Sequence, residues 1–153
     1  MKVTQVNVYA KRLAMTAGYN MSSAAVGDPE TTVVKILTDT SHVGWGEICP
    51  TGPLPQVEHA QSIQADLGLL GPALIGVDPE RIGLVHDAMT AIMDGGHGAR
   101  SAIDIACWDL LGKAHNRRIC DLQNMVFGCG DSKSLITQPM VHSQPNQTEK
   151  RTV

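Results

Sequence analysis

The sequence predicts an α+β fold in which a three-stranded antiparallel meander is followed by a three-helix bundle. Residues 2–49 hold short runs of alternating or β-branched residues separated by turns, whereas residues 56–114 hold apolar side chains at three- and four-residue spacing. Strands followed by helices are typical of α+β domains. A chain of 153 residues, with 42% hydrophobic and 18% charged residues, is large enough for one such core.

Three strands are expected in the amino-terminal part. Residues 2–10 alternate polar and apolar side chains, residues 31–39 are rich in β-branched residues, and residues 43–49 follow a short polar turn. Antiparallel neighbours can be joined by such short turns. Residues 11–30 have no periodicity, so we expect a long loop there that is either functional or disordered.

Two helices are expected after a proline-rich connection at residues 49–55. The first is predicted over residues 56–70 and is interrupted by Gly71-Pro72, because proline cannot donate the hydrogen bond that continues a helix. The second is predicted to run from an N-cap at Asp78 to Met93.

A third helix, predicted over residues 99–114, organises the rest of the chain. Apolar residues fill most of its circumference, so we expect burial nearly all round. Asp109 and Lys113 stand four apart in the order that favours an exposed ion pair, and Asn116 suits a left-handed residue after the helix. Its stripe of small and branched residues lets another element approach closely, and consists of Ala99, Ala102, Ile103, Ala106 and Leu110.

Composition and charge argue against several classes of protein. The formal net charge of −3 provides no basic footprint for nucleic acid or for an anionic membrane surface. No apolar run approaches the roughly 18 residues of a spanning helix, and the amino terminus lacks the apolar segment of a secretory signal, so we expect a cytoplasmic protein. The four cysteines show no paired metal-binding spacing and are expected to be reduced thiols.

Residues 99–113 also carry a family resemblance. The stretch Ala-Arg-Ser-Ala-Ile-Asp-Ile-Ala-Cys-Trp-Asp-Leu-Leu-Gly-Lys resembles the signature helix of the mandelate racemase/muconate lactonizing enzyme family of the enolase superfamily. Gly44-Trp45-Gly46-Glu47 resembles a second, shorter motif of that family. The resemblance implies that residues 1–122 form an enolase-like N-terminal capping domain, followed over residues 123–153 by an altered linker, a first barrel strand and a disordered tail.

In this family the chemistry belongs to a (β/α)-barrel that follows the capping domain. Barrel carboxylates hold Mg²⁺, and a lysine or histidine base removes the proton α to a substrate carboxylate, as in racemases, epimerases and dehydratases. A barrel takes on the order of 200 residues. The resemblance therefore implies no catalytic residue, no metal ligand and no cofactor in this chain, and no activity of the chain alone.

The resemblance does imply that the domain shapes the substrate pocket, through loops at residues 18–23 and 49–53. Aromatic and flexible apolar side chains suit such contacts. Equally, these side chains could pack only on their own domain. Glu47 is expected to be a hydrogen-bond anchor. The expected substrate-binding residues are Tyr19, Met21, Ser22, Cys49 and Thr51.

Two functions stay open at this point. The first is the capping part of a Mg²⁺-dependent isomerase or lyase; the sequence looks most like members that act on proline-derived carboxylates, hydroxyproline dehydratases and proline-betaine epimerases. The second is a non-catalytic interaction module or a decayed remnant. A barrel encoded beyond Val153 would favour the first. In both cases a lone capping domain would expose its barrel-facing apolar surface and self-associate, and would bind a small carboxylate only together with a barrel.

Overall fold

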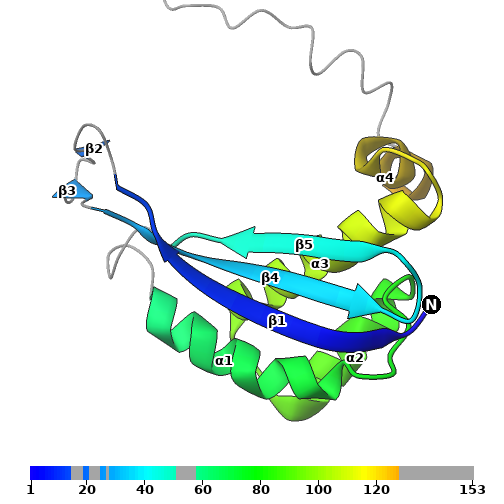
Figure 1. Cartoon of the computed structure of the whole chain (residues 1–153), viewed down its shortest axis with the longest axis horizontal. Helices are drawn as coiled ribbons and strands as arrows, with labels where there is room; N and C mark the ends of the chain where they lie inside the picture. Colours follow the sequence, from blue (N-terminus) through cyan, green and yellow to red (C-terminus); the bar gives the residue numbers. More distant parts are fainter. Residues whose placement is uncertain (15–18, 21–24, 27, 51–57, 128–153) are drawn as a thin grey trace, which may run out of the picture. The chain divides into compact units, whose positions relative to one another are not determined.

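The computed structural model describes residues 1–14, 19–20, 25–26, 28–50 and 58–127. The chain divides into two units, Met1–Ile119 and Cys120–Val153. The first unit holds a three-stranded antiparallel sheet with helices against one face, which confirms the predicted α+β class (Figure 1). In the second unit, the described residues belong to helix α4 (Ile119–Phe127).

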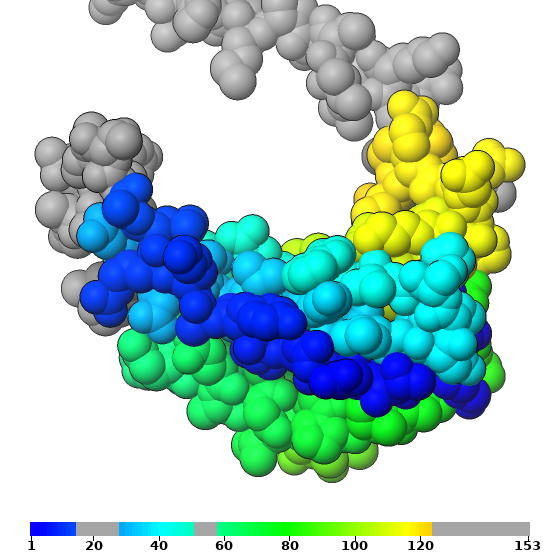
Figure 2. Space-filling view, viewed as in Figure 1, coloured from blue at the N-terminus to red at the C-terminus, as the bar shows by residue number. Residues whose placement is uncertain are grey.

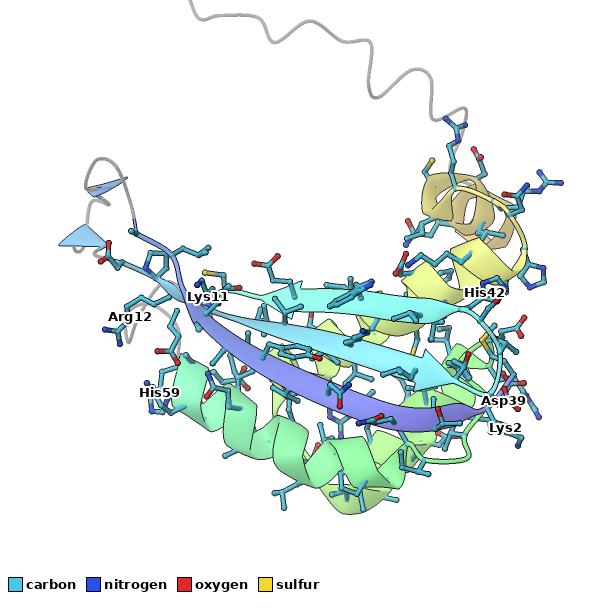
Figure 3. The ribbon with its side chains drawn as sticks, viewed as in Figure 1. Lys2, Lys11, Arg12, Asp39, His42 and His59 are labelled. Carbon is cyan, nitrogen blue, oxygen red and sulfur yellow. The ribbon has the colours of Figure 1, made fainter. Side chains whose placement is uncertain are left out.

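The sheet has the strand order β1-β4-β5 and is built from β1 (Val3–Arg12), β4 (Glu30–Thr38) and β5 (Val43–Ile48). These strands confirm the three predicted segments, with ends shifted by one or two residues. At the end of the sheet where β4 terminates, the Lys2 N–H donates to the Asp39 carboxylate at 2.7 Å, and the Asp39 N–H donates to the Lys2 carbonyl at 2.9 Å (Figure 3).

The long loop predicted over residues 11–30 is shorter than expected. β1 continues to Arg12, and two short strands, β2 (Tyr19–Asn20) and β3 (Ala25–Val26), pair antiparallel with each other. A strand of two residues is too short to show an alternating pattern, so periodicity could not reveal this pair.

Helix α1 (Ala60–Ala73) begins with a capping box. The Ser62 N–H donates to His59 Nδ1 at 3.0 Å, and the His59 N–H donates to Ser62 Oγ at 3.0 Å. The predicted interruption at Gly71-Pro72 is wrong, because Pro72 lies inside the last turn of the helix. At that position proline removes one hydrogen bond from a helix that is about to end.

Helix α2 (Ile82–Ile92) begins later than predicted. Asp78 is not the N-cap; instead it closes a turn, since its carbonyl accepts the Arg81 N–H at 3.1 Å and its carboxylate accepts the Glu80 N–H at 3.2 Å. Asparagine, aspartate and serine make such local turns as readily as they cap helices. Pro79, which follows Asp78, therefore belongs to this turn and not to the first turn of α2.

Helix α3 (His97–Ala114) confirms the third predicted helix, and Asn116 is left-handed after it, with φ of 49°. Burial all round is wrong in part, because Ile105 is 44% exposed. α1 lies against β1 and β4, and α3 against β4 and β5, so that the sheet forms a layer over the helices (Figure 2). The fully buried core between these layers includes Val34, Ile36, Ile63, Leu67, Leu70, Val85, Met89, Ile103, Ala106 and Leu110.

The second unit differs from expectation over its described part. A linker turn was predicted from Gln123 onwards, but α4 continues to Phe127. Ile119, Leu122 and Val126 recur at helical spacing, which accounts for the helix. The predicted barrel strand and tail lie outside the described residues. Among those residues, none of the helices has the length and apolarity needed to cross a membrane.

Candidate functional site

The signature helix α3 approaches β5 so closely that only glycine fits on the strand. A Cβ at Gly46 would lie 1.9 Å from the Ala102 carbonyl oxygen, and a Cβ at Gly44 would lie 2.3 Å from the Ala106 carbonyl oxygen. Both alanines are fully buried. The small residues of the two motifs are therefore complementary halves of one helix–strand contact. The sequence predicted that another element approaches the alanine stripe closely, and the structure identifies that element as β5.

Asp109 and Lys113 hold the same helix to the outer edge of β5. The Asp109 carboxylate accepts the backbone N–H of Trp45 at 2.9 Å, and the Lys113 ammonium donates to the Val43 carbonyl at 2.7 Å. The two side chains also bind each other at 2.6 Å, which confirms the predicted ion pair. An edge strand otherwise leaves such backbone groups unpaired. Asp109 and Lys113 thus bind backbone groups that would otherwise be unpaired at the edge of β5.

On the outer face of the sheet, the side chains of Trp45 and Glu47 alternate with the two glycines. The Lys35 ammonium lies 5.1 Å from the centre of the Trp45 ring, within the range of a cation–π contact. The Thr31 hydroxyl donates to the Glu47 carboxylate at 2.6 Å. This contact agrees with the expectation that Glu47 is a hydrogen-bond anchor.

A cavity of about 570 Å³ lies where α3 begins and β5 ends. Its polar side chains are Glu58, His97 and Ser101, and apolar contacts come from the end of β5 and from α1. A concave site with a few convergent polar groups is the usual form of a small-molecule pocket. The lining residues are Ile48, Pro50, Glu58, Ile63, Gly95, Gly96, His97, Gly98 and Ser101.

The amino end of α3 is already occupied at this cavity. The Glu58 carboxylate accepts the backbone N–H of His97 at 2.8 Å and that of Gly98 at 2.6 Å. The start of a helix attracts anions because its first N–H groups are unpaired and its dipole is positive there. Since Glu58 satisfies both, a substrate carboxylate would not find a free binding site at this helix end.

The predicted substrate-binding residues fall in different parts of the chain. Cys49 follows β5 as a half-buried free thiol next to Pro50, which lines the cavity. Tyr19 belongs to β2 and pairs with Val26. Met21, Ser22 and Thr51 lie outside the described residues. Of the five, Cys49 is the one whose side chain the structure describes, and it lies between Ile48 and Pro50, which both line the cavity.

Glu58 was not predicted as a functional residue. Its partners are backbone N–H groups, whose positions cannot be predicted from a pattern of side chains. The one signal available was the run Gly95-Gly96-His97-Gly98, because glycine at the fourth position of this run leaves room for an approaching carboxylate. Arg100 also went unnoticed: its guanidinium donates to the Thr90 hydroxyl at 3.1 Å and to the Met93 carbonyl, which joins the end of α2 to α3.

Within the described ranges, no group of three or more histidine, cysteine, aspartate or glutamate side chains is placed to hold a metal ion. Burial, reinforced by the Asp104 carboxylate, raises the pKa of Cys107 to about 12, so this thiol is not a nucleophile at neutral pH. The described residues therefore do not supply a set of ligands that fits Mg²⁺.

Comparisons with known proteins identify the family to which this domain is similar. Residues 3–123 match the family described as mandelate racemase / muconate lactonizing enzyme, N-terminal domain. The chain is 40% identical over 116 residues to cis-3-hydroxy-L-proline dehydratase of Roseibium aggregatum, a match that covers 74% of this chain and 32% of that enzyme.

Solved structures show the same relation. N-succinyl Arg/Lys racemase from Bacillus cereus is 35% identical with a TM-score of 0.75, over 80% of this chain and 33% of that one. Dipeptide epimerase from Enterococcus faecalis, complexed with Mg and the dipeptide L-Leu-L-Tyr, is 30% identical with a TM-score of 0.75, over 80% of this chain and 34% of that one. The chain thus spans about a third of the length of these relatives. With the motifs, the fold and the match over residues 3–123 in agreement, the chain belongs to the mandelate racemase/muconate lactonizing enzyme family, within its N-terminal domain.

Proposed function

We propose that this chain is the substrate-capping domain of a Mg²⁺-dependent racemase, epimerase or dehydratase that acts on a small carboxylate. The observation that carries the proposal is the match of residues 3–123 to the N-terminal domain of this family. The described residues offer a cavity with polar side chains but no group of metal ligands. That combination suits a domain that covers a substrate and leaves metal binding and proton transfer to another domain.

The chain's own contribution would be to bind and orient the substrate and to exclude water. The residues proposed for these contacts are those that the sequence singled out, Tyr19, Met21, Ser22, Cys49 and Thr51. Closing a site against water strengthens the electrostatic interactions within it, which is what an enolate-forming reaction needs. Mg²⁺, when bound by a barrel, would stabilise the negative charge that develops on the substrate.

A proline-derived carboxylate is the substrate class we favour. Support comes from the 40% identity to the hydroxyproline dehydratase, compared with 33% to N-succinyl-L-Arg/Lys racemase and 32% to hydrophobic dipeptide epimerase. Specificity in an enzyme of this architecture depends on both domains. The sequence identity over the capping domain therefore indicates a class of substrates and not a single compound.

A domain exchange tests the capping function. Residues 1–122 of this chain would replace the corresponding first third of the Roseibium aggregatum dehydratase, and turnover of cis-3-hydroxy-L-proline would be measured with Mg²⁺. We expect a folded, active chimera. A chimera that folds, binds Mg²⁺ and shows no turnover would contradict the capping function and favour a non-catalytic interaction module.

Within an active chimera, Tyr19→Ala tests the proposed substrate contact. Loss of one aromatic contact corresponds to about 1.4 kcal/mol, or about a tenfold rise in KM, with a smaller change in kcat. Leu69→Ala is the matched control, because Leu69 is 60% exposed on α1. If the Tyr19→Ala chimera and its parent had equal KM and kcat, Tyr19 would not contact the substrate.

The outer face of the sheet is the surface we propose for contact with a barrel, or with a second copy when a barrel is absent. Tyr9 and Trp45 are 47% and 45% exposed there. Exposed apolar patches of this kind mark interaction surfaces. We expect concentration-dependent self-association of the isolated chain in light scattering, reduced in Trp45→Glu. A monomer at high concentration would count against this surface.

A further inference from the structure

The outer face of the sheet, opposite the helices, carries an apolar stripe that crosses all three strands (Figure 1). Tyr9 on β1 lies directly opposite Val33 on β4, and Trp45 on β5 lies one step further along the sheet, opposite Lys35. Tyr9 and Trp45 are 47% and 45% exposed, and Val33 between them is half-buried. The three side chains therefore form a diagonal stripe that is accessible at the surface.

Opposite charges lie on the two sides of this stripe. Lys35 is level with Trp45 in the sheet, and Glu47 is level with Val33. Residues two apart along a strand share a face, so these four side chains form one block on the outer face. Val33 and Trp45 occupy one diagonal of the block, along the stripe, and the two charged residues occupy the other diagonal.

Both charged side chains can contact a partner. The Lys35 ammonium lies 5.1 Å from the centre of the Trp45 ring. Glu47 is exposed and accepts one hydrogen bond from the Thr31 hydroxyl, which leaves further acceptor positions on its carboxylate. In the described part of the chain, neither residue forms an ion pair. Lys11, also on this face, pairs with Thr31 at the end of the sheet, outside the block.

This arrangement of charges is complementary to itself. Rotation by 180° about an axis that runs along the stripe lays the stripe of one copy on that of another. The same rotation places Lys35 of each copy opposite Glu47 of the other, so the ion pair forms twice. Because the axis is diagonal to the strands, the two sheets cross steeply, as in orthogonal sheet packings.

We propose that this chain pairs with a second copy of itself through the outer face of its sheet. Tyr9, Val33 and Trp45 form the centre of the contact, and two Lys35–Glu47 pairs between the copies flank it. The charge complementarity of the face to itself selects this partner. The inference rests on the interaction surface proposed above, and it does not depend on the capping function.

Charge reversal tests the arrangement in the intact chain. Lys35→Glu and Glu47→Lys each replace two attractions between copies by two repulsions. Exposed charge pairs change an affinity by about twofold to threefold each, so four such changes should raise the dissociation constant, measured by sedimentation equilibrium, about thirtyfold. In an equimolar mixture of the two variants, opposite charges face each other again. The mixture should dimerise within about threefold of wild type, although each variant keeps its own lost contacts.

Two variants on α2 control for net charge. Asp87→Lys and Arg81→Glu make the same changes in net charge on exposed residues of the helical layer, away from the sheet. Both should dimerise like wild type. In about 1 M salt the differences between wild type and the two reversed variants should shrink, because exposed charges are then screened within about 3 Å. Circular dichroism checks that each variant is folded.

Three results would overturn the proposal: a wild-type chain that stays monomeric at millimolar concentration, reversals that leave the dissociation constant unchanged, or a mixture as weakly associated as its components. If Trp45→Glu weakens association and the reversals do not, the surface is correct and the symmetric arrangement is wrong. An active domain-exchange chimera alongside a monomeric chain would reject the dimer and leave the capping function in place, so the two failures can be told apart.

Discussion

The middle of α3 and its amino end make contacts of different kinds. In the middle, backbone meets backbone: the carbonyls of Ala102 and Ala106 face Gly46 and Gly44 at distances that exclude a Cβ. At the amino end, side chains surround a cavity of about 570 Å³, and a flexible carboxylate caps the helix. The residues that make the family recognisable belong mainly to the first region. The strongest family signal in this chain is therefore a signal of packing.

This difference matters for how each region responds to change. Backbone atoms of a helix and a strand can separate only if a whole element shifts within a close-packed core, whereas a glutamate side chain can adopt another rotamer. Substitutions in the middle of α3 and on β5 should consequently cost more stability than equivalent substitutions at the amino end.

Gly46→Ala should have the largest effect. Its Cβ would overlap the Ala102 carbonyl at 1.9 Å, so we expect a loss of about 3 kcal/mol in the free energy of unfolding, measured by urea denaturation. Gly68→Ala is the matched control, because no atom lies within 4 Å of its Cβ and alanine favours a helix by up to about 1 kcal/mol. A mild effect at Gly46 would mean that α3 can slide away from β5.

Asp109→Ala should come next, at about 2 kcal/mol. The substitution removes the acceptor of the Trp45 N–H and the partner of Lys113 at once, and hydrogen bonds to charged groups contribute about 1.5–3 kcal/mol. Asp104→Ala serves for comparison, since its pairing with His86 at the surface should contribute less than about 1 kcal/mol. Equal losses in the two variants would show that the contacts at the edge of β5 contribute nothing beyond a surface ion pair to the free energy of unfolding.

The pH dependence of stability should show how tightly the middle of α3 is packed. Burial raises the pKa of Cys107 from 9.0 to about 12, so above pH 9 the unfolded chain releases a proton that the folded chain keeps. This contribution is complete below pH 9 and is lost as the pH rises towards 12, at about 1.4 kcal/mol per pH unit. The stability advantage of wild type over Cys107→Ala should shrink between pH 8 and 10.5; parallel curves would show that the thiol is accessible.

Gly98→Ala should have the smallest effect, about 1 kcal/mol. The atoms that its Cβ would meet belong to side chains and not to backbone: the Glu58 carboxylate can rotate away, and the buried Ile63 side chain must shift slightly. The amide signals of His97 and Gly98 should shift in NMR spectra because the Glu58 carboxylate moves. A loss as large as that of Gly46→Ala would erase the distinction between the two regions.

Most of the fold could be predicted from the sequence because periodicity reports burial. The strands and α3 followed from alternation and from helical spacing, and the small residues of α3 predicted a close approach by another element. The errors arose where one residue type serves two purposes. Pro72 lies within the final turn of α1, and Asp78 closes a turn rather than capping α2.

The candidate site could be predicted only in part. The strand pattern placed Cys49 at the end of β5, where the structure shows a half-buried free thiol. Glu58 escaped notice because it recognises backbone N–H groups 39 and 40 residues away, and a backbone group looks the same at every position of a sequence. Long-range contacts of side chains with backbone leave no local pattern, so they emerge only when the chain is folded.

The most direct test of the central claim, that this chain packs and caps while the chemistry belongs to a barrel, is proton exchange. The folded chain would be incubated in D₂O with Mg²⁺ and with hydroxyproline isomers or proline betaine, and the α-proton signal followed by NMR. We expect no loss of that signal beyond a protein-free blank. Exchange above the blank would reveal a base and a metal site within this chain and would contradict the account.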